Sequence, residues 1–320
     1  MQNRRYPKIF IRSKSEFAKH ISHKNFTKED ALKLINDVKI NFEKYWKDSK
    51  RSDPKKEKYV RNAKGTPLGM LLKKINSLIL APHDKILPNF IFGGLKDLNH
   101  AKAAKHLLGN KRKRTLLKLD IKHFFEQIGL GRVFIFFQNK CGCSKKASKL
   151  LSSLCCVSLG PKGSNNPIKT IARGFATSSR LAVWCNLDIF IALNKLIQKR
   201  LKGHDPRIAI YVDDIGITAS RINKETMEKL YIEIKKLFYS FDKNQLLPLH
   251  DIKDKGGIIT HNENMQILGL QLNRNTLSIG SKTRSKKNKL MNKLKISTDK
   301  KILKNKYMSL IRYKNYIESL

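Results

Sequence analysis

Two adjacent aspartates stand between two short apolar runs in the second half of the chain. Residues 208–212 read IAIYV, residues 215–218 read IGIT, and Asp213 and Asp214 lie between them. Strand-like runs joined by so short a polar segment predict a β-hairpin with both carboxylates at its tip. Side-by-side carboxylates repel each other, and a divalent cation turns that repulsion into a binding site. The alternative is a plain solvated turn, since Asp is a common turn residue.

A third carboxylate follows another predicted strand. Residues 115–119 read TLLKL and lead into Asp120, which is followed by IKHFF. Mg²⁺ prefers oxygen ligands and typically sits between a few carboxylates and the phosphates of a nucleotide. Two such ions form the clamp used in nucleotidyl transfer. We therefore expect Asp120, Asp213 and Asp214 to form a catalytic centre that binds two Mg²⁺ ions.

Much of the remaining chain shows helical patterns. Residues 27–30, TKED, have the composition of a helix start, and a glycine at residue 174 precedes another apolar helical pattern. The expected elements are helices over residues 68–80, 132–139, 146–157, from about 179 to 199 and over 224–242, a hairpin over 267–280 and two helical patterns within 281–320.

The two aspartate segments resemble a known family. YVDD at residues 211–214 and LDIKHFF at 119–125 are similar to the two aspartate boxes of reverse transcriptases, with bacterial retron-type and defence-associated enzymes the most similar branches. The likeness runs from about residue 90 to residue 279. It implies an α+β right-hand polymerase with a palm of antiparallel sheet and helices. The implied division is an N-terminal region and fingers in 1–100, palm in 101–128, fingers in 129–168, palm in 169–275 and a short helical thumb in 276–320.

The resemblance also implies a function and partners. The chain would be an RNA-directed DNA polymerase that makes cDNA from a dedicated noncoding RNA, in bacterial antiphage defence. Its partners would be that RNA as template and primer, the cDNA product, dNTPs and, as a further option, an effector protein. By the same likeness, the backbone carbonyl of Ile121 would join Asp120, Asp213 and Asp214 as a metal ligand.

Several residues are expected to bind the incoming nucleotide. Phe125 occupies the position that in the family lies beneath the sugar and blocks a 2′ hydroxyl, which predicts dNTPs, whereas Phe124 fits a core residue better. Arg173 stands where the family commonly has glutamine, just before Gly174 at a helix start that favours phosphate. The full expected set is Arg61, Lys64, His123, Phe124, Phe125, Arg173, Gly174 and Lys253.

The charge of the chain predicts a polyanionic partner. With 67 basic and 25 acidic residues the net charge is +42, a positive field that attracts nucleic acid in a salt-dependent way. Lys111, Arg112, Lys113 and Arg114 directly precede the first aspartate strand and either follow a phosphate backbone or form an ordinary solvated face. Tyr211 of YVDD and Gly269, in a region similar to the family's primer grip, complete the expected nucleic-acid-binding residues.

The composition also bears on location and cysteine chemistry. Because the first twelve residues are polar and basic and no apolar run approaches a membrane span, we expect a cytoplasmic bacterial protein without a membrane partner. The odd number of cysteines, five, fits reduced thiols. Zinc is disfavoured because Cys141, Cys143, Cys155 and Cys156 lack the usual gap of two to four residues within each pair.

Three other functions compete with templated reverse transcription. A viral-type RNA-dependent RNA polymerase would carry a smaller residue at the sugar gate and Gly or Ser before the aspartates, and both are opposed by Phe125 and Tyr211. A catalytically divergent RNA-binding or maturase-like module would tolerate losing the carboxylates. Departures from the family pattern at Ala172 and Arg173 leave template-independent DNA synthesis open as well.

Overall fold

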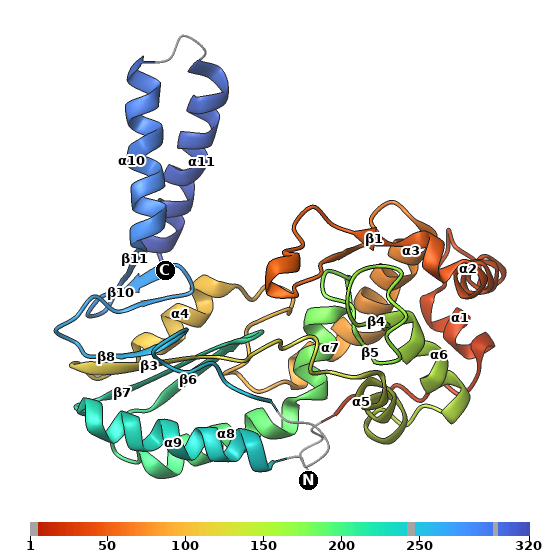
Figure 1. Ribbon diagram of the computed structural model, residues 1–320, viewed down its shortest axis with the longest axis horizontal. Coiled ribbons are helices and arrows are strands. Elements are labelled where there is room, and N and C mark those ends of the chain that lie inside the picture. The colour runs from red at the N-terminus through yellow and green to blue at the C-terminus, as the bar shows by residue number, and fades with distance from the viewer. Residues whose placement is uncertain (1–5, 242–246, 297–299) are drawn as a thin grey trace.

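The computed structural model describes residues 6–241, 247–296 and 300–320. Within these ranges the chain is a mixed α/β structure whose sheets are antiparallel, in agreement with the predicted α+β class. Figure 1 shows a helix-rich half built largely from the earlier residues, a sheet-containing half beside it, and a helical hairpin that stands up from the latter. The division into fingers, palm and thumb stays a prediction.

Four antiparallel strands form the central sheet of the second half, in the order β6-β7-β3-β8. They are β3 (Arg114–Asp120), β6 (Arg207–Tyr211), β7 (Asp214–Ser220) and β8 (Gly257–Ile259). Strands β6 and β7 form the predicted hairpin, and β7 pairs with β3 along its whole length. Apolar residues dominate β3 and β7, which are almost entirely buried because helices cover both faces of the sheet.

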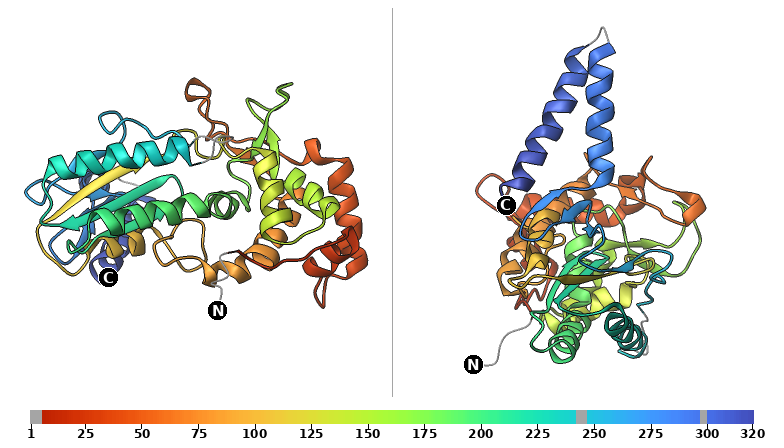
Figure 2. Two further views of the ribbon diagram at one scale, coloured as in Figure 1. Left: turned by 90° about the horizontal axis from the view of Figure 1, so that it is seen from below. Right: turned by 90° about the vertical axis from the view of Figure 1, so that its left-hand side faces the viewer.

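Three helices cover this sheet. Helices α8 (Leu187–Arg200) and α9 (Lys224–Ser240) pack side by side on one face, and α9 contacts β3 and β8 (Figures 1 and 2). On the other face α4 (His100–Leu108) contacts β6 and β7. Asn99 begins α4 as an N-cap, since its side-chain oxygen accepts hydrogen bonds from the backbone N–H groups of Ala101 and Lys102.

The helix-rich half is built around an apolar core shared with the sheet. Thr27 and Asp30 form a capping box at the start of α2, which confirms the helix start expected at TKED. The helices of this half are α1 (Lys14–Ile21), α2 (Lys28–Ile40), α3 (Pro67–Lys74), α5 (Leu130–Ile135), α6 (Lys145–Cys155) and α7 (Ser178–Cys185), and π-helical turns extend α3 through η3 (Ile75–Leu80) and α5 through η5 (Phe136–Lys140). Its short elements are η1 (Phe42–Tyr45), η2 (Pro54–Lys56), η4 (Ala81–Ile86) and the strand pairs β1 (Lys47–Asp48) with β2 (Arg61–Asn62) and β4 (Cys156–Ser158) with β5 (Lys169–Ile171).

The C-terminal elements form a small sheet and a helical hairpin. Strands β9 (Gln266–Ile267), β10 (Leu270–Leu272) and β11 (Leu277–Ile279) make a three-stranded meander, so the expected hairpin over 267–280 gains a strand. Helices α10 (Ser281–Ile296) and α11 (Lys300–Glu318) then stand clear of the rest (Figures 1 and 2). The base of the hairpin is anchored to α4, because the Tyr313 hydroxyl lies 2.7 Å from His100 Nε2 and Ile317 is fully buried.

Two helix expectations were wrong in detail. The helix expected to run to residue 199 breaks at buried Asn186, where α7 and α8 meet at 59°. The Asn186 amide donates to the carbonyl oxygen of Ala182, a local side-chain bond that competes with the regular helical pattern. The helix expected over 224–242 is α9, which ends at Ser240. Its last buried apolar residue is Phe238, and Phe241 beyond the helix is 39 % exposed.

Among the described residues, no single helix is both long and apolar enough to cross a bilayer, and only the bent pair α7 and α8 meets those criteria jointly, by length and composition alone.

Candidate active site

The sheet brings the three predicted aspartates to one end. Asp120 is the last residue of β3 and lies directly opposite Asp214, the first residue of β7. Asp213 occupies the two-residue turn before β7, and its backbone oxygen accepts a hydrogen bond of 3.1 Å from the backbone N–H of Ile121. Residues 94 positions apart in the sequence therefore meet through strand pairing.

The turn between β6 and β7 adopts a conformation that its sequence does not favour. Val212 has φ of +61°, in the left-handed region that β-branched residues avoid. A neighbouring segment holds the turn, because Ile210 exchanges backbone hydrogen bonds of 2.8 Å with Phe90 and Phe92. Gly93 lies against the Val212 backbone, where a Cβ atom would clash. The strained turn is thus maintained by tertiary contacts, as is common at functional sites.

The aspartates at the turn are electrostatically coupled. Burial, followed by the charges of Asp213 and Asp120, raises the pKa of Asp214 to about 6. Burial and the charge of Asp120 also raise the pKa of Asp213, although Arg173 and Lys255 partly offset this. Carboxylates that disfavour each other's ionisation form a donor set that a cation would stabilise.

Two basic side chains that the sequence did not single out contact Asp120. The Lys255 ammonium donates a hydrogen bond of 2.7 Å to Asp120 Oδ1, and His250 Nε2 lies 3.3 Å from the same oxygen. Burial, more than any nearby charge, lowers the pKa of His250. By contrast, the expected Lys253 is exposed, and its backbone N–H donates to the side chain of Asp251.

Lys255 reaches Asp120 because of the glycines that follow it. Gly257 begins β8 and pairs with Lys118 of β3, two residues before Asp120. A Cβ atom on Gly256 would lie 2.7 Å from the Lys118 carbonyl oxygen, so only glycine allows this close approach. The sequence Lys-Gly-Gly at residues 255–257 is the local feature from which the approach of Lys255 to Asp120 could have been predicted.

The three aspartates have the chemistry to bind a hard cation, but their side chains are not arranged around a common point. Carboxylate oxygens are the ligands that Mg²⁺ prefers. Within the described ranges, however, no group of three or more His, Cys, Asp or Glu side chains has an arrangement that could hold a metal ion. Asp120 instead pairs with the Lys255 ammonium. The two Mg²⁺ ions and the Ile121 carbonyl ligand therefore stay predictions.

Arg173 and Phe125 form a small assembly with Glu126. The Arg173 guanidinium donates through Nε and Nη2 to both carboxylate oxygens of Glu126, at 3.1 and 2.9 Å. The centre of the same guanidinium lies 4.8 Å from the centroid of the Phe125 ring. Phe125 is 7 % exposed, whereas Phe124 is fully buried against Phe190. Phe124 is therefore a core residue, and Glu126 is a partner that sequence reasoning missed.

The remaining expected nucleotide-binding residues differ in exposure. Lys64, His123 and Gly174 are exposed. The backbone at residue 174 has φ of +98°, a conformation that favours glycine. The Arg61 side chain is buried instead and pairs with Asp48 and with the carbonyl oxygens of Ser158 and Gly160. Its charge is therefore satisfied inside the protein, contrary to the expectation that it would face a triphosphate.

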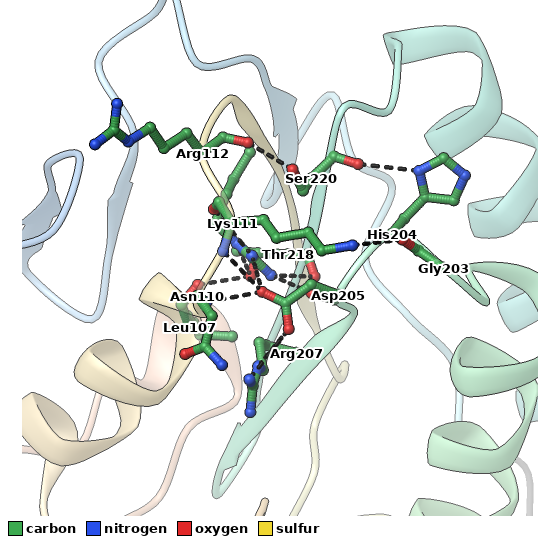
Figure 3. Close-up of polar contacts among 11 residues, drawn as sticks. Leu107, Asn110, Lys111, Arg112, Gly203, His204, Asp205, Arg207, Thr218 and Ser220 are labelled. Atoms are coloured by element: carbon green, nitrogen blue, oxygen red, sulfur yellow. Dashed lines mark hydrogen bonds and ion pairs between the residues drawn. The ribbon is translucent and has the colours of Figure 1, made fainter.

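Arg114 is likewise a structural residue. Its guanidinium donates to Asp205 Oδ2 at 2.7 Å and to Thr218 Oγ1 at 3.1 Å, and the side chain is 6 % exposed. The Asp205 carboxylate also accepts the backbone N–H groups of Asn110 and Lys111 (Figure 3). Burial alone would raise the pKa of Asp205, but these hydrogen bonds outweigh it and lower the pKa to about 2. Arg114 therefore cannot follow a phosphate backbone as expected, whereas Lys111, Arg112 and Lys113 are exposed.

A cavity of about 530 Å³ adjoins the aspartates. Asp120, Asp214 and Lys255 line it together with Tyr211 and Gly269, the two residues expected to contact nucleic acid near the centre. The structure thus brings Tyr211 and Gly269 to the acidic end of the sheet. The fold and this site define a mixed α/β protein with three aspartates, partly to fully buried, at one end of an antiparallel sheet.

Comparisons with known proteins add a structural likeness. No protein-family model matches the chain, and no curated protein matches its sequence. Among solved structures the chain is similar to telomerase from Candida albicans in complex with the TWJ fragment of telomeric RNA, with a TM-score of 0.46 and 11 % sequence identity. The match covers 77 % of this chain and 45 % of that chain, so this chain spans less than half the length of its neighbour.

Proposed function

We propose that this chain is an RNA-directed DNA polymerase of the reverse transcriptase type, with Asp120, Asp213 and Asp214 at its catalytic centre. The observation that carries the proposal is the register of β3 and β7, which sets Asp120 opposite Asp214 with Asp213 in the adjoining turn. Nothing in a solvated turn requires a third carboxylate from a distant strand. Burial and the charge of Asp120 raise the pKa values of both Asp213 and Asp214, and such perturbed carboxyl groups fit a cation-binding site.

The aspartates would hold two Mg²⁺ ions, which supply charge stabilisation to the attacking 3′ hydroxyl and the leaving pyrophosphate. The protein then contributes mainly position and electrostatics. Asp120 and Asp213 would bind both ions, and Asp214 would support them. Lys255 would compete with a cation for Asp120, since its ammonium donates to one of the carboxylate oxygens. Tyr211 and Gly269, on the same cavity, would contact the primer strand.

The right-hand organisation forms part of the proposal. The helix-rich residues 1–100 and 129–168 would act as fingers, the central sheet with its helices as the palm, and α10 with α11 as a thumb that closes over a duplex. The thumb helices are rich in lysine, which suits sequence-independent contact with phosphates.

Phe125 would discriminate between deoxyribonucleotides and ribonucleotides. Its ring is nearly buried, and Arg173 fixes it from one side while Glu126 holds Arg173. An aromatic ring so constrained cannot move aside for a 2′ hydroxyl. Deoxynucleotides are therefore the proposed substrates. In this arrangement Arg173 would act through Phe125, because its guanidinium lies against the ring and is held by two hydrogen bonds to Glu126.

The biological setting is an extension of the same proposal. A dedicated noncoding RNA would provide template and primer, and antiphage defence in the bacterial cytoplasm, with or without an effector protein, would be the context. The net charge of +42 supports a nucleic-acid partner. Sequencing the nucleic acid that copurifies with the full chain tests this extension, since a single RNA joined to or paired with cDNA is expected. A mixture of cellular RNAs without DNA would contradict it.

The test of activity is primer extension by the full chain on an RNA template with a DNA primer, dNTPs and Mg²⁺. We expect Asp213→Asn to lower the rate at least about 100-fold, because losing a metal-binding charge costs several kcal/mol of transition-state stabilisation. Asp254→Asn is the matched control, because this substitution removes the same charge at an exposed residue next to Lys255. Equal rates for the Asp213 variant and the wild type would refute the assignment.

The competing functions give different results in the same assay. RNA binding without DNA synthesis by the wild type would favour the RNA-binding module. Extension with NTPs rather than dNTPs would favour an RNA polymerase. DNA synthesis whose product does not follow the template sequence would favour template-independent synthesis.

A further inference from the structure

A second cavity lies at the opposite end of the central sheet from the aspartates. It has a volume of about 580 Å³, within the range of small-ligand sites. It is bounded by the end of α4, the loop before β3 and strand β10. Strand β3 has seven residues, so six steps of about 3.3 Å put Arg114 about 20 Å from Asp120. This cavity is therefore separate from the acidic centre, and we refer to it as the distal groove.

The floor of the distal groove is apolar and its rim is basic. Leu107 and Leu108 line it from α4, Met265 from the residue before β9, and Leu272 from β10. The cations on its rim are Arg112, Lys113 and Arg274. In the part of the chain that the structure describes, no hydrogen bond or ion pair engages their charged side-chain groups, in contrast to Arg114 beside them.

The polar groups of the wall are compatible with an anionic ligand. The one carboxylate on the lining, that of Glu263, accepts hydrogen bonds from the backbone N–H and hydroxyl of Thr260, which lower its pKa. His261 and Gln271 add an aromatic ring and a side-chain amide that can both donate and accept. An apolar floor under a rim of unpaired cations suits a ligand that is flat and apolar in one part and anionic in another. A nucleotide has this composition.

Two of the three rim cations, Arg112 and Lys113, lie in a loop whose backbone is anchored by hydrogen bonds. Asp205 accepts the N–H groups of Asn110 and Lys111, and the Ser220 hydroxyl donates 2.5 Å to the carbonyl oxygen of Arg112 (Figure 3). The Arg221 N–H donates 2.9 Å to the carbonyl oxygen of Lys113, which has φ of +54°. A surface loop anchored at each residue presents its side chains with little further loss of backbone entropy on binding.

We propose that the distal groove binds one unpaired nucleotide of an RNA strand, with its base on the apolar floor and the flanking phosphates on Arg112, Lys113 and Arg274. Recognition of RNA frequently uses unstacked bases in single-stranded loops, which can enter such a pocket. The proposal rests on the proposed function, since the strand would belong to the RNA that the chain copies. A contact about 20 Å from the acidic centre would let the protein hold that RNA independently of the primer terminus.

The test compares two triple variants of the full chain that remove the same charge. Arg112→Gln, Lys113→Gln and Arg274→Gln alter the rim. Lys195→Gln, Lys199→Gln and Lys236→Gln alter exposed positions on α8 and α9, the two helices on the face of the sheet opposite α4. Binding of a single-stranded RNA oligonucleotide is measured by fluorescence anisotropy at several salt concentrations. For the rim variant we expect at least tenfold weaker binding. The slope of log K against log salt concentration should be smaller by about 2, because three phosphate contacts are lost at about 0.7 each. The control variant on α8 and α9 should bind as the wild type does.

Crosslinking locates the base. RNA that contains 4-thiouridine, irradiated with the wild type, should attach within residues 261–274 or 107–113, and millimolar free nucleotide should not displace it. The idea is overturned if both triple variants lose affinity equally, if the crosslinks map elsewhere, or if free nucleotide competes as well as RNA does. Because binding and crosslinking need no DNA synthesis, a failure of the distal groove and a failure of the polymerase proposal are distinguishable.

Discussion

Replacing Asp205 by asparagine should destabilise the protein by about 2 to 3 kcal/mol, because the carboxylate neutralises an arginine that the fold has buried. Arg114 is 6 % exposed and donates to both the side chain and the backbone oxygen of Asp205. Lowering the pKa of Asp205 from an unfolded value of about 3.9 to about 2 corresponds to about 2.6 kcal/mol before any allowance for solvent. Because the Asp205 carboxylate is partly exposed, solvent screening reduces this contribution to the free energy of unfolding to about 1 to 2 kcal/mol. The cost of leaving the Arg114 charge unpaired accounts for the remainder.

The assay is urea unfolding, followed by circular dichroism, of the wild type, the Asp205→Asn variant, the Arg114→Met variant and the double variant. The double variant should recover part of the loss, because removing both charges leaves none buried without a partner. The pH dependence gives an independent check of sign. A depressed folded pKa stabilises the protein above the unfolded pKa, so the difference between wild type and Asp205→Asn should be full at pH 6 and shrink as the pH falls from about 4 towards about 2. A difference below about 0.5 kcal/mol at pH 6, within the usual range for surface substitutions, would refute the reasoning.

Two further predictions concern the acidic end of the sheet. Phe125→Ala should lower the discrimination of dNTPs over NTPs at least about tenfold in primer extension, about 1.4 kcal/mol, whereas Phe124→Leu should alter stability and leave discrimination unchanged. Unaltered discrimination in Phe125→Ala would remove it from the sugar gate. Lys255→Met should bind Mn²⁺ about two- to fivefold more tightly in a calorimetric titration, because the partly exposed ion pair with Asp120 competes with the cation by up to about 1 kcal/mol. Lys253→Met is the control, and weaker Mn²⁺ binding by the Lys255 variant would show that its ammonium assists the cation.

Local patterns in the sequence were enough to predict several elements of the fold. Strand-like runs on both sides of Asp213 and Asp214 predicted the hairpin of β6 and β7, and TLLKL predicted most of β3. The TKED sequence predicted the start of α2 through a capping box made within four residues. These features depend on side-chain alternation, turn residues and capping groups, all of which act between near neighbours in the chain.

The roles of the basic residues could not be predicted in this way. In sequence, Lys253 and Lys255 are equivalent lysines two positions apart, yet only Lys255 reaches Asp120, through the pairing of β8 with β3. Arg61 and Arg114 look like surface cations in a chain of charge +42, but both are buried against carboxylates from distant segments. Whether a basic side chain is buried depends on packing between distant segments, and the local charge pattern does not predict this packing.

By itself, then, the sequence determined which residues end strands and which turn holds two carboxylates, because backbone preference and apolar alternation are local properties. Tertiary structure decided that Asp120 would lie opposite Asp214, that Glu126 would hold Arg173 beside Phe125, and that a basic loop would be anchored over an apolar groove. The physical reason is that strand register, ion pairing and burial are set by contacts between segments many residues apart, and those contacts exist only once the chain has folded.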